Sequence, residues 1–221
     1  NELPADEGIS HFLEHMLFDG TTVRSKDEFD TYIFKNALQR NASTSYDWTN
    51  YYLQGPADRL EAMIAIHAEM LKGPALLDEQ FTREREVVKE ERRRAQDNPS
   101  SWLFRQMLNA TWSHANYDHQ VLGTMESLNG QSNQQMRDYF AKHYGPNNAI
   151  TVAIGDFDAE AVLEELMRAF ADWPRRTLPL VPAVGKDPQT APRQVVLDGA
   201  FETTTQMLTF QAPPYAAAET Y

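Results

Sequence analysis

The stretch Ile9-Ser10-His11-Phe12-Leu13-Glu14-His15-Met16-Leu17-Phe18 has the spacing of a helix with two different faces. At about 100° per residue, Glu14 and His15 lie within about 60° of His11, so three polar side chains share one sector. The opposite sector is apolar and contains Ile9, Phe12, Leu13, Met16 and Leu17. The sequence therefore predicts a helix over residues 8–18 that packs by one face and presents two imidazoles and a carboxylate on the other.

The polar face of this helix suits a metal site. Neutral imidazole is a good ligand for zinc, and two imidazoles one turn apart can share one tetrahedral ion. We interpret His11 and His15 as ligands of one Zn²⁺ and Glu14 as a base beside it, with a third protein ligand still required. A pair of partly buried helix histidines without a metal is the alternative at this point.

A second predicted helix, residues 78–96, carries two acidic residues on its packing face. Glu84 and Glu91 lie within about 80° of Phe81, on the same stripe as Val88. A carboxylate on such a face is costly unless it is paired or binds a metal. The two residues either join the metal site or pair with basic residues of their own helix, for which Arg85, Arg92, Arg93 and Arg94 are available.

With these residues in place, the chain resembles the pitrilysin (insulinase) family of inverted-motif zinc peptidases, which includes the mitochondrial processing peptidase. In that family two His of the motif and a distant Glu bind zinc, and the motif Glu is the general base. Glu91 stands 76 positions after His15, as the family's third ligand does, and Glu84 stands seven positions before Glu91. The resemblance implies His11, His15 and Glu91 as zinc ligands, Glu14 as general base and Glu84 as a residue that supports the ligands.

Other stretches resemble family landmarks and occur in the family's order across almost the whole chain. They are Gly8-Ile9-Ser10, Phe18-Asp19-Gly20-Thr21, Asn41-Ala42-Ser43-Thr44-Ser45, Arg83-Glu84-Arg85-Glu86-Val87-Val88, Tyr144-Gly145-Pro146-Asn147-Asn148-Ala149 and Ile154-Gly155-Asp156-Phe157. The resemblance implies that residues 1–221 form one catalytic domain. It also implies that this domain lacks the family's N-terminal strands and its homologous C-terminal domain, which supplies an Arg and a Tyr that hold the substrate.

Residues 41–55 are rich in Thr, Tyr and Trp, and only the last of them is Gly or Pro, which predicts a strand. In the family an equivalent strand lies at the sheet edge beside the zinc, and an extended substrate adds to it. The resemblance implies Asn41 and Ala42 as substrate contacts, and an ordinary core strand is the alternative. Asn36-Ala37 stands where relatives usually carry Gly, and Asn is the residue that next best tolerates a positive φ.

The remaining pattern predicts an α+β fold. Asp78 is the expected N-cap of its helix, and Asn98-Pro99 the stop. Further helices are predicted at residues 57–72, 100–112, 132–143 and 158–171, strands at 37–55, 148–155, 193–199 and 203–212, and a proline-rich linker at 174–192. This order indicates a two-layer sandwich in which helices cover one face of a mostly antiparallel sheet.

Composition restricts the partners. The 221 residues are 42% hydrophobic, contain no Cys and carry a formal net charge of −12. This charge argues against a nucleic-acid backbone as partner, and it favours cationic peptides if the acidic residues line the site. The chain has no apolar run that would cross a bilayer. We expect a soluble bacterial protein, located in the periplasm rather than the cytoplasm.

These observations predict a zinc-dependent endopeptidase that hydrolyses peptides or unfolded segments. Its expected partners are a peptide substrate and a homologous C-terminal domain or partner subunit, with a dimer as a further expectation from the family. Two alternatives stay open: a non-catalytic subunit of the same family, and a zinc hydrolase that acts on a small molecule. A non-catalytic relative usually has a broken motif, whereas all five motif positions are present here.

Overall fold

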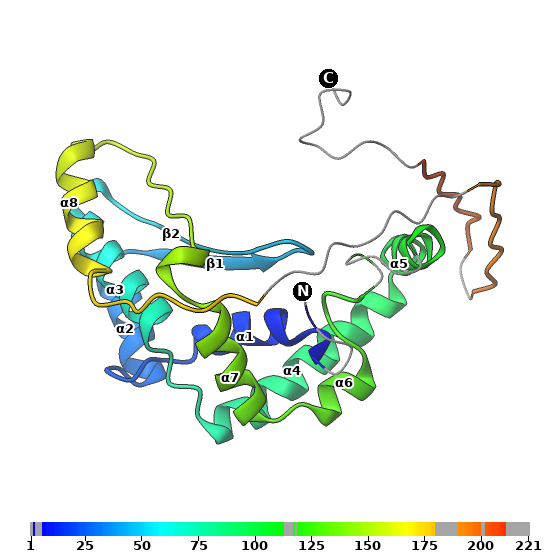
Figure 1. The fold of residues 1–221 in the computed structure, drawn as a ribbon, viewed down its shortest axis with the longest axis horizontal. Helices are drawn as coiled ribbons and strands as arrows, with labels where there is room; N and C mark the ends of the chain where they lie inside the picture. Colours follow the sequence, from blue (N-terminus) through cyan, green and yellow to red (C-terminus); the bar gives the residue numbers. More distant parts are fainter. Residues whose placement is uncertain are drawn as a thin grey trace.

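The computed structural model describes residues 2, 6–112, 117, 119–179, 190–199 and 202–210. An antiparallel hairpin lies over a layer of helices, and α1 runs between them (Figure 1). In chain order the elements are α1 (Ile9–Leu17), α2 (Lys26–Lys35), β1 (Gln39–Thr44), β2 (Thr49–Gln54), η2 (Ala57–Arg59), α3 (Leu60–Lys72), α4 (Asp78–Asp97), α5 (Pro99–Thr111), α6 (Met125–Gly130), α7 (Asn133–His143), η3 (Pro146–Asn148) and α8 (Ala159–Ala169). This combination of helices and an antiparallel sheet confirms the α+β class.

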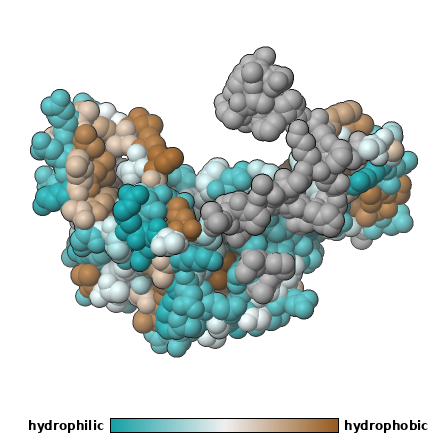
Figure 2. Space-filling view, viewed as in Figure 1, coloured by the Kyte–Doolittle hydropathy of each residue, from teal (hydrophilic) through white to brown (hydrophobic). Residues whose placement is uncertain are grey.

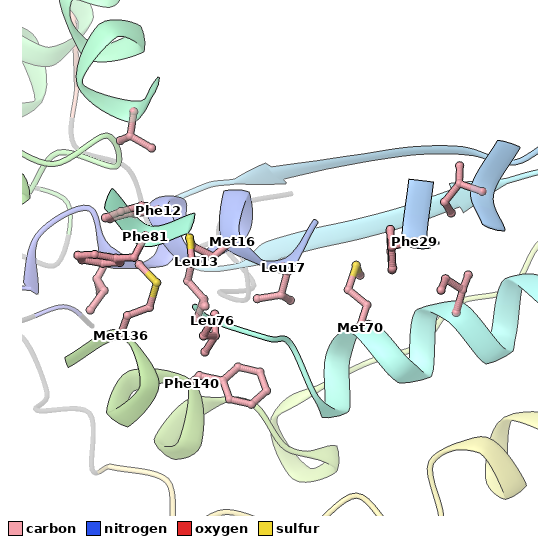
Figure 3. Packing of buried hydrophobic residues seen from close by; sticks show 14 of the residues in the cluster. Phe12, Leu13, Met16, Leu17, Phe29, Met70, Leu76, Phe81, Met136 and Phe140 are labelled. Carbon is pink, nitrogen blue, oxygen red and sulfur yellow. The ribbon is translucent and has the colours of Figure 1, made fainter. Parts of the chain in front are cut away.

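The buried core is built around the apolar face of α1. Phe12 stacks on Phe81 of α4 with ring centroids 4.7 Å apart, and Met136 of α7 packs beside this pair (Figure 3). All five residues that the helical spacing placed on the apolar face are fully buried, namely Ile9, Phe12, Leu13, Met16 and Leu17. The opposite face of α1 is therefore fixed in direction toward β1 and α4.

The start of α4 differs from the prediction. Leu77 is the N-cap and Asp78 is the first helical residue, so the expected Asp78 cap is wrong. The Gln80 side chain accepts a hydrogen bond from the Leu77 amide at 3.2 Å, which leaves the Asp78 carboxylate available for α7. That carboxylate accepts from Arg137 at 3.0 Å and from Asn133 at 2.5 Å. Asp78 therefore joins two helices instead of capping one.

The single strand predicted over residues 37–55 is a hairpin of two strands. Asn41 of β1 lies opposite Tyr52 of β2, and the turn between the strands is closed by a hydrogen bond from Ser45 N to Trp48 O of 2.8 Å. A turn without Gly or Pro explains why the sequence pattern looked continuous. The positive φ before β1 belongs to Ala37 (53°), whereas Asn36 has φ of −95°.

The strands predicted near residues 148–155, 193–199 and 203–212 are wrong for the described part of these segments, which contains no strand. A strand needs a hydrogen-bonded neighbour, and in the described part of the chain only β1 and β2 pair with each other as strands. Ile150 and Ile154 are more than 90% exposed. Together with β2, α3 and α8, their segment lines a groove of about 980 Å³.

Hydrophobic residues gather at the end of the molecule where this groove lies. Figure 2 shows them in brown at the left, where Figure 1 places α8. Exposed members include Val152, Leu163 and Met167. Within the described residues, no helix has the length and apolar character that a membrane crossing requires.

Two glycines join the beginning of α1 to the loop before α6. Gly8 is the N-cap of α1 and has φ of 87°, while Gly123 has φ of 71°. A Cβ atom on Gly8 would lie 2.5 Å from the Gly123 Cα, closer than real Cβ contacts allow. Both the close approach and the positive φ therefore require glycine at these positions.

Candidate metal centre

Helices α1 and α4 pack side by side and bring three predicted ligands together. Glu91 Oε2 lies 3.6 Å from His11 Nε2 and 3.4 Å from His15 Nε2. One ligand atom from each of the three residues lies within 4.8 Å of the others. Ligands bonded to a tetrahedral zinc ion at about 2.0–2.2 Å are themselves roughly 3.3–3.6 Å apart. The spacing and the donor set of two imidazoles and one carboxylate therefore fit Zn²⁺.

Glu84 lies behind His15, on the side away from Glu91. Its Oε2 atom is 3.6 Å from His15 Nδ1, and its Oε1 atom is 3.2 Å from Arg83 Nε. The sequence left two roles open for Glu84, joining the metal site or pairing with a basic residue of its own helix. Glu84 has both, since it faces His15 and pairs with an Arg of α4. That Arg is Arg83, which was not among the four expected partners.

Glu14 is buried beside the ligands and contacts the hairpin. Its Oε2 atom accepts a hydrogen bond from the Thr44 hydroxyl of β1. The same hydroxyl lies 3.2 Å from the Thr49 hydroxyl of β2. Burial raises the pKa of Glu14, although the Thr44 hydrogen bond and the charge of His15 act in the opposite direction. A carboxylate with a raised pKa is a stronger base.

Thr44 was missed by the sequence analysis, but a signal for it existed. Alternate residues of a strand share one face, so the residue two positions after Ala42 points to the same side of β1. Ala42 lines the cleft at the ligands, and Thr44 continues that line toward Glu14. Strand periodicity applied to the predicted substrate strand would have identified it.

The two histidines have opposite tendencies to bind protons. Burial, followed by the charge of His15, lowers the pKa of His11 to about 4. Burial also lowers the pKa of His15, but the neighbouring Glu84 and Glu91 outweigh it and leave the pKa above its ordinary value. His11 is therefore neutral near pH 7, as a zinc ligand must be, and His15 is held between two carboxylates.

The ligands open into a cleft of about 420 Å³. Phe18, Lys26, Asn41 and Ala42 line it together with the acidic and histidine side chains. The Asn41 side chain accepts a hydrogen bond from the Ala42 amide at 2.9 Å. The structure thus places both predicted substrate-contact residues at the cleft, while their role stays a prediction.

Comparison with known proteins identifies the family of the chain. Residues 1–125 match the family model described as insulinase (peptidase family M16), and residues 132–221 match the model described as the peptidase M16 inactive domain. The zinc protease PqqE of Helicobacter pylori is 31% identical over 165 residues, which cover 74% of this chain and 37% of that protein. The mitochondrial-processing peptidase subunit beta of Homo sapiens is 26% identical over 167 residues, covering 76% of this chain and 34% of that subunit.

The fold is shared with a solved relative. The crystal structure of the periplasmic protease PqqL from Escherichia coli superposes with a TM-score of 0.74 at 25% identity, over 85% of this chain and 22% of that one. The chain spans roughly a third to a half of the length of the curated relatives it matches. Because the first family model matches more than half of its residues, the chain belongs to the insulinase family of peptidases, family M16.

Proposed function

We propose that this chain carries the catalytic centre of a zinc-dependent endopeptidase that hydrolyses peptides or unfolded protein segments. The observation that carries the proposal is the convergence of His11, His15 and Glu91 around one position, with Glu14 buried beside it. All four residues lie in the part of the chain that matches the insulinase model rather than the inactive-domain model. The relatives named zinc proteases support zinc as the metal.

The chemistry divides between the metal and the chain. Zinc bound by the three ligands would lower the pKa of a water molecule and polarise the scissile carbonyl. Glu14 accepts the proton of the attacking water and passes it to the departing amine. Its hydrogen bond from Thr44 holds the carboxylate at the cleft that Glu14 lines. His11 and His15 keep their Nε2 atoms on the Glu91 side.

The edge of β1 offers a place for an extended peptide. Among the described residues β1 pairs with β2 alone, so its other edge has no strand beside it. Asn41 and Ala42 belong to that strand and line the cleft. A peptide added along this edge would be held by main-chain hydrogen bonds, which suit a peptidase that accepts many sequences.

The preference for cationic peptides stays a prediction. Carboxylates of Glu14, Asp19, Glu84 and Glu91 line the cleft, but Arg83 and Lys26 contact Asp19. If the acidic excess governs capture, a basic peptide will be cleaved faster than an acidic one, and this advantage will fall with salt. Equal and salt-independent rates for the two peptides would remove the hypothesis.

We further propose that residues 1–221 act together with a homologous C-terminal domain or a partner subunit, in a protein that can dimerise. The short coverage of the relatives supports a larger working unit. A periplasmic location is the proposal consistent with the described location of PqqL from Escherichia coli. Size-exclusion chromatography with light scattering and cell fractionation test these two points.

Replacing Glu14 with Gln in the full-length protein tests the central proposal. The variant should bind zinc as the wild type does and should lose hydrolysis of an unstructured peptide library by at least about 1,000-fold, because the base is gone. Glu90→Gln, an exposed substitution on α4, serves as control. Full activity of the Glu14 variant would refute the assignment, and a wild type that cleaves only small esters would favour the small-molecule hydrolase.

A further inference from the structure

A polar cluster lies on the far side of His15 from Glu91, and the reaction described above does not use it. It contains Asp19 in the turn after α1, Lys26 of α2, and Gln80, Arg83 and Glu84 of α4. Asp19 is only 3% exposed, which is unusual for a carboxylate that is not itself a ligand. A buried carboxylate persists when it is paired, so its partners indicate what it does.

Asp19 is fixed from three sides. Arg83 Nη2 lies 2.6 Å from its Oδ2 atom, and Lys26 Nζ lies 3.4 Å from its Oδ1 atom. The Gln80 side chain donates to the Asp19 carbonyl oxygen at 2.5 Å, which ties the turn to α4. The Asp19 carboxylate is therefore a stationary acceptor for Arg83.

Arg83 joins Asp19 to the metal centre through one guanidinium group. While Nη2 binds Asp19, the Nε atom lies 3.2 Å from Glu84 Oε1. The other oxygen of Glu84, Oε2, faces His15 Nδ1 at 3.6 Å. A planar guanidinium offers donors at fixed angles, so it can hold two carboxylates in one arrangement, which the flexible ammonium of Lys cannot do.

A series of contacts connects the turn after α1 to His15. A His that binds zinc by Nε2 is oriented by the group beside its Nδ1–H, and the carboxylate that faces His15 Nδ1 is that of Glu84, at 3.6 Å. Glu84 can perform this task only if its carboxylate stays in place. Its close neighbour Asp19 repels it, since Glu84 contributes to raising the pKa of Asp19. Arg83 lies between the two carboxylates and offsets this repulsion.

We propose that Arg83, anchored by Asp19, is a positioning residue that fixes Glu84 behind His15 and so increases the affinity of the centre for zinc. This inference rests on the metal site proposed above. Arg83 is half exposed, so the residue can be changed without opening the core. Because Asp19 is buried, the loss of Arg83 also lowers the stability of the fold, so zinc affinity is judged against the melting temperature of the zinc-free protein.

The test compares Arg83→Gln, Arg83→Lys and the control Arg93→Gln in the full-length protein. Arg93 lies on the same helix and pairs with Glu90 in solvent, so its loss removes an equal charge away from the ligands. Zinc affinity is measured by chelator competition and the melting temperature of the zinc-free protein by calorimetry. We expect Arg83→Gln to weaken zinc binding about 10- to 100-fold, more than its fall in melting temperature accounts for. Arg83→Lys should restore part of the zinc affinity, and Arg93→Gln should leave it unchanged.

A double variant separates positioning from simple charge. If Asp19 acts through Arg83, Asp19→Asn weakens zinc binding, and the pair Asp19→Asn with Arg83→Gln is no weaker than Arg83→Gln alone. The proposal is overturned if Arg83→Gln binds zinc as tightly as the wild type, or if Arg93→Gln loses as much zinc affinity. It is also overturned if the loss of zinc affinity across the variants follows their melting temperatures. Glu91→Gln distinguishes its failure from failure of the metal site, because that variant loses zinc whether or not Arg83 matters.

Discussion

The metal centre and the apolar groove use the same kinds of elements but differ in how much of their structure is complete. At the centre, α1 and α4 bury their apolar faces against each other, and the ligands project from the remaining sides. At the groove, the segment around Ile150 to Ile154 exposes its hydrophobic residues and forms no strand. Helices make their own backbone hydrogen bonds, whereas a strand depends on a neighbouring strand. The helices of the metal centre therefore form within this chain, whereas the segment at the groove lacks the neighbour that a strand needs.

The largest expected difference between the two regions is in stability. Phe12→Ala removes a fully buried ring next to Phe81 and should lower the free energy of unfolding by about 3–5 kcal/mol. Ile154→Ala removes a side chain that is 91% exposed and should change it by less than about 0.5 kcal/mol. Urea titration measures both, and equal losses would mean that the groove is as well packed as the core.

The second-largest expected effect is on zinc binding, which belongs to the metal centre and not to the groove. Glu91→Gln removes one of the three proposed ligands, so zinc affinity should fall at least about 100-fold, more than for a residue behind the ligands. Glu90→Gln, its exposed neighbour in sequence, provides the matched control. Equilibrium dialysis against zinc would exclude Glu91 as a ligand if the two variants bound the metal equally.

The groove should respond to pH through His67, whose pKa burial lowers to about 4. Between about pH 6.5 and pH 4 the unfolded chain binds this proton and the folded chain does not, so stability decreases as pH falls through this range. His67→Gln should remove on the order of 2 kcal/mol of the loss between pH 7 and pH 5. If wild type and variant lost the same unfolding free energy between pH 7 and pH 5, the burial of His67 would be contradicted.

The smallest effect concerns the orientation of the base. Thr44→Val removes the hydrogen bond to Glu14 and should lower kcat about tenfold, with KM and zinc affinity unchanged, since about 1.4 kcal/mol corresponds to one factor of ten. Thr44→Ser keeps the hydroxyl and should restore kcat. If the Ser variant were as slow as the Val variant, shape rather than the hydrogen bond would be responsible.

The sequence predicted the parts of the centre that depend on a single helix. The spacing of His11, Glu14 and His15, and the stripe that selects Glu84 and Glu91, follow from helical periodicity, and the structure places these residues together. Periodicity says nothing about which side chain of another element approaches. The contacts of Thr44 with Glu14 and of Arg83 with Asp19 come from the register and packing of separate elements.

Some of what was missed had a local signal. Helix α2 begins with a capping box in which the Ser25 amide donates to Glu28 at 2.8 Å, and this Ser-x-x-Glu pattern is visible in the sequence. The hairpin turn at Ser45 to Trp48 had no such signal, because it contains neither Gly nor Pro. The predicted strand near residues 148–155 had the right composition but no partner strand within the described chain.

The contact between Gly8 and Gly123 has a consequence for how this protein can vary. Gly8 stands three residues before His11, and its backbone touches a loop more than a hundred positions further along the chain. Any side chain at either position would push α6 away from the helix that carries both histidines. In a saturation-mutagenesis library selected for activity, these two codons should be as intolerant as those of the proposed zinc ligands, although neither glycine has a functional group.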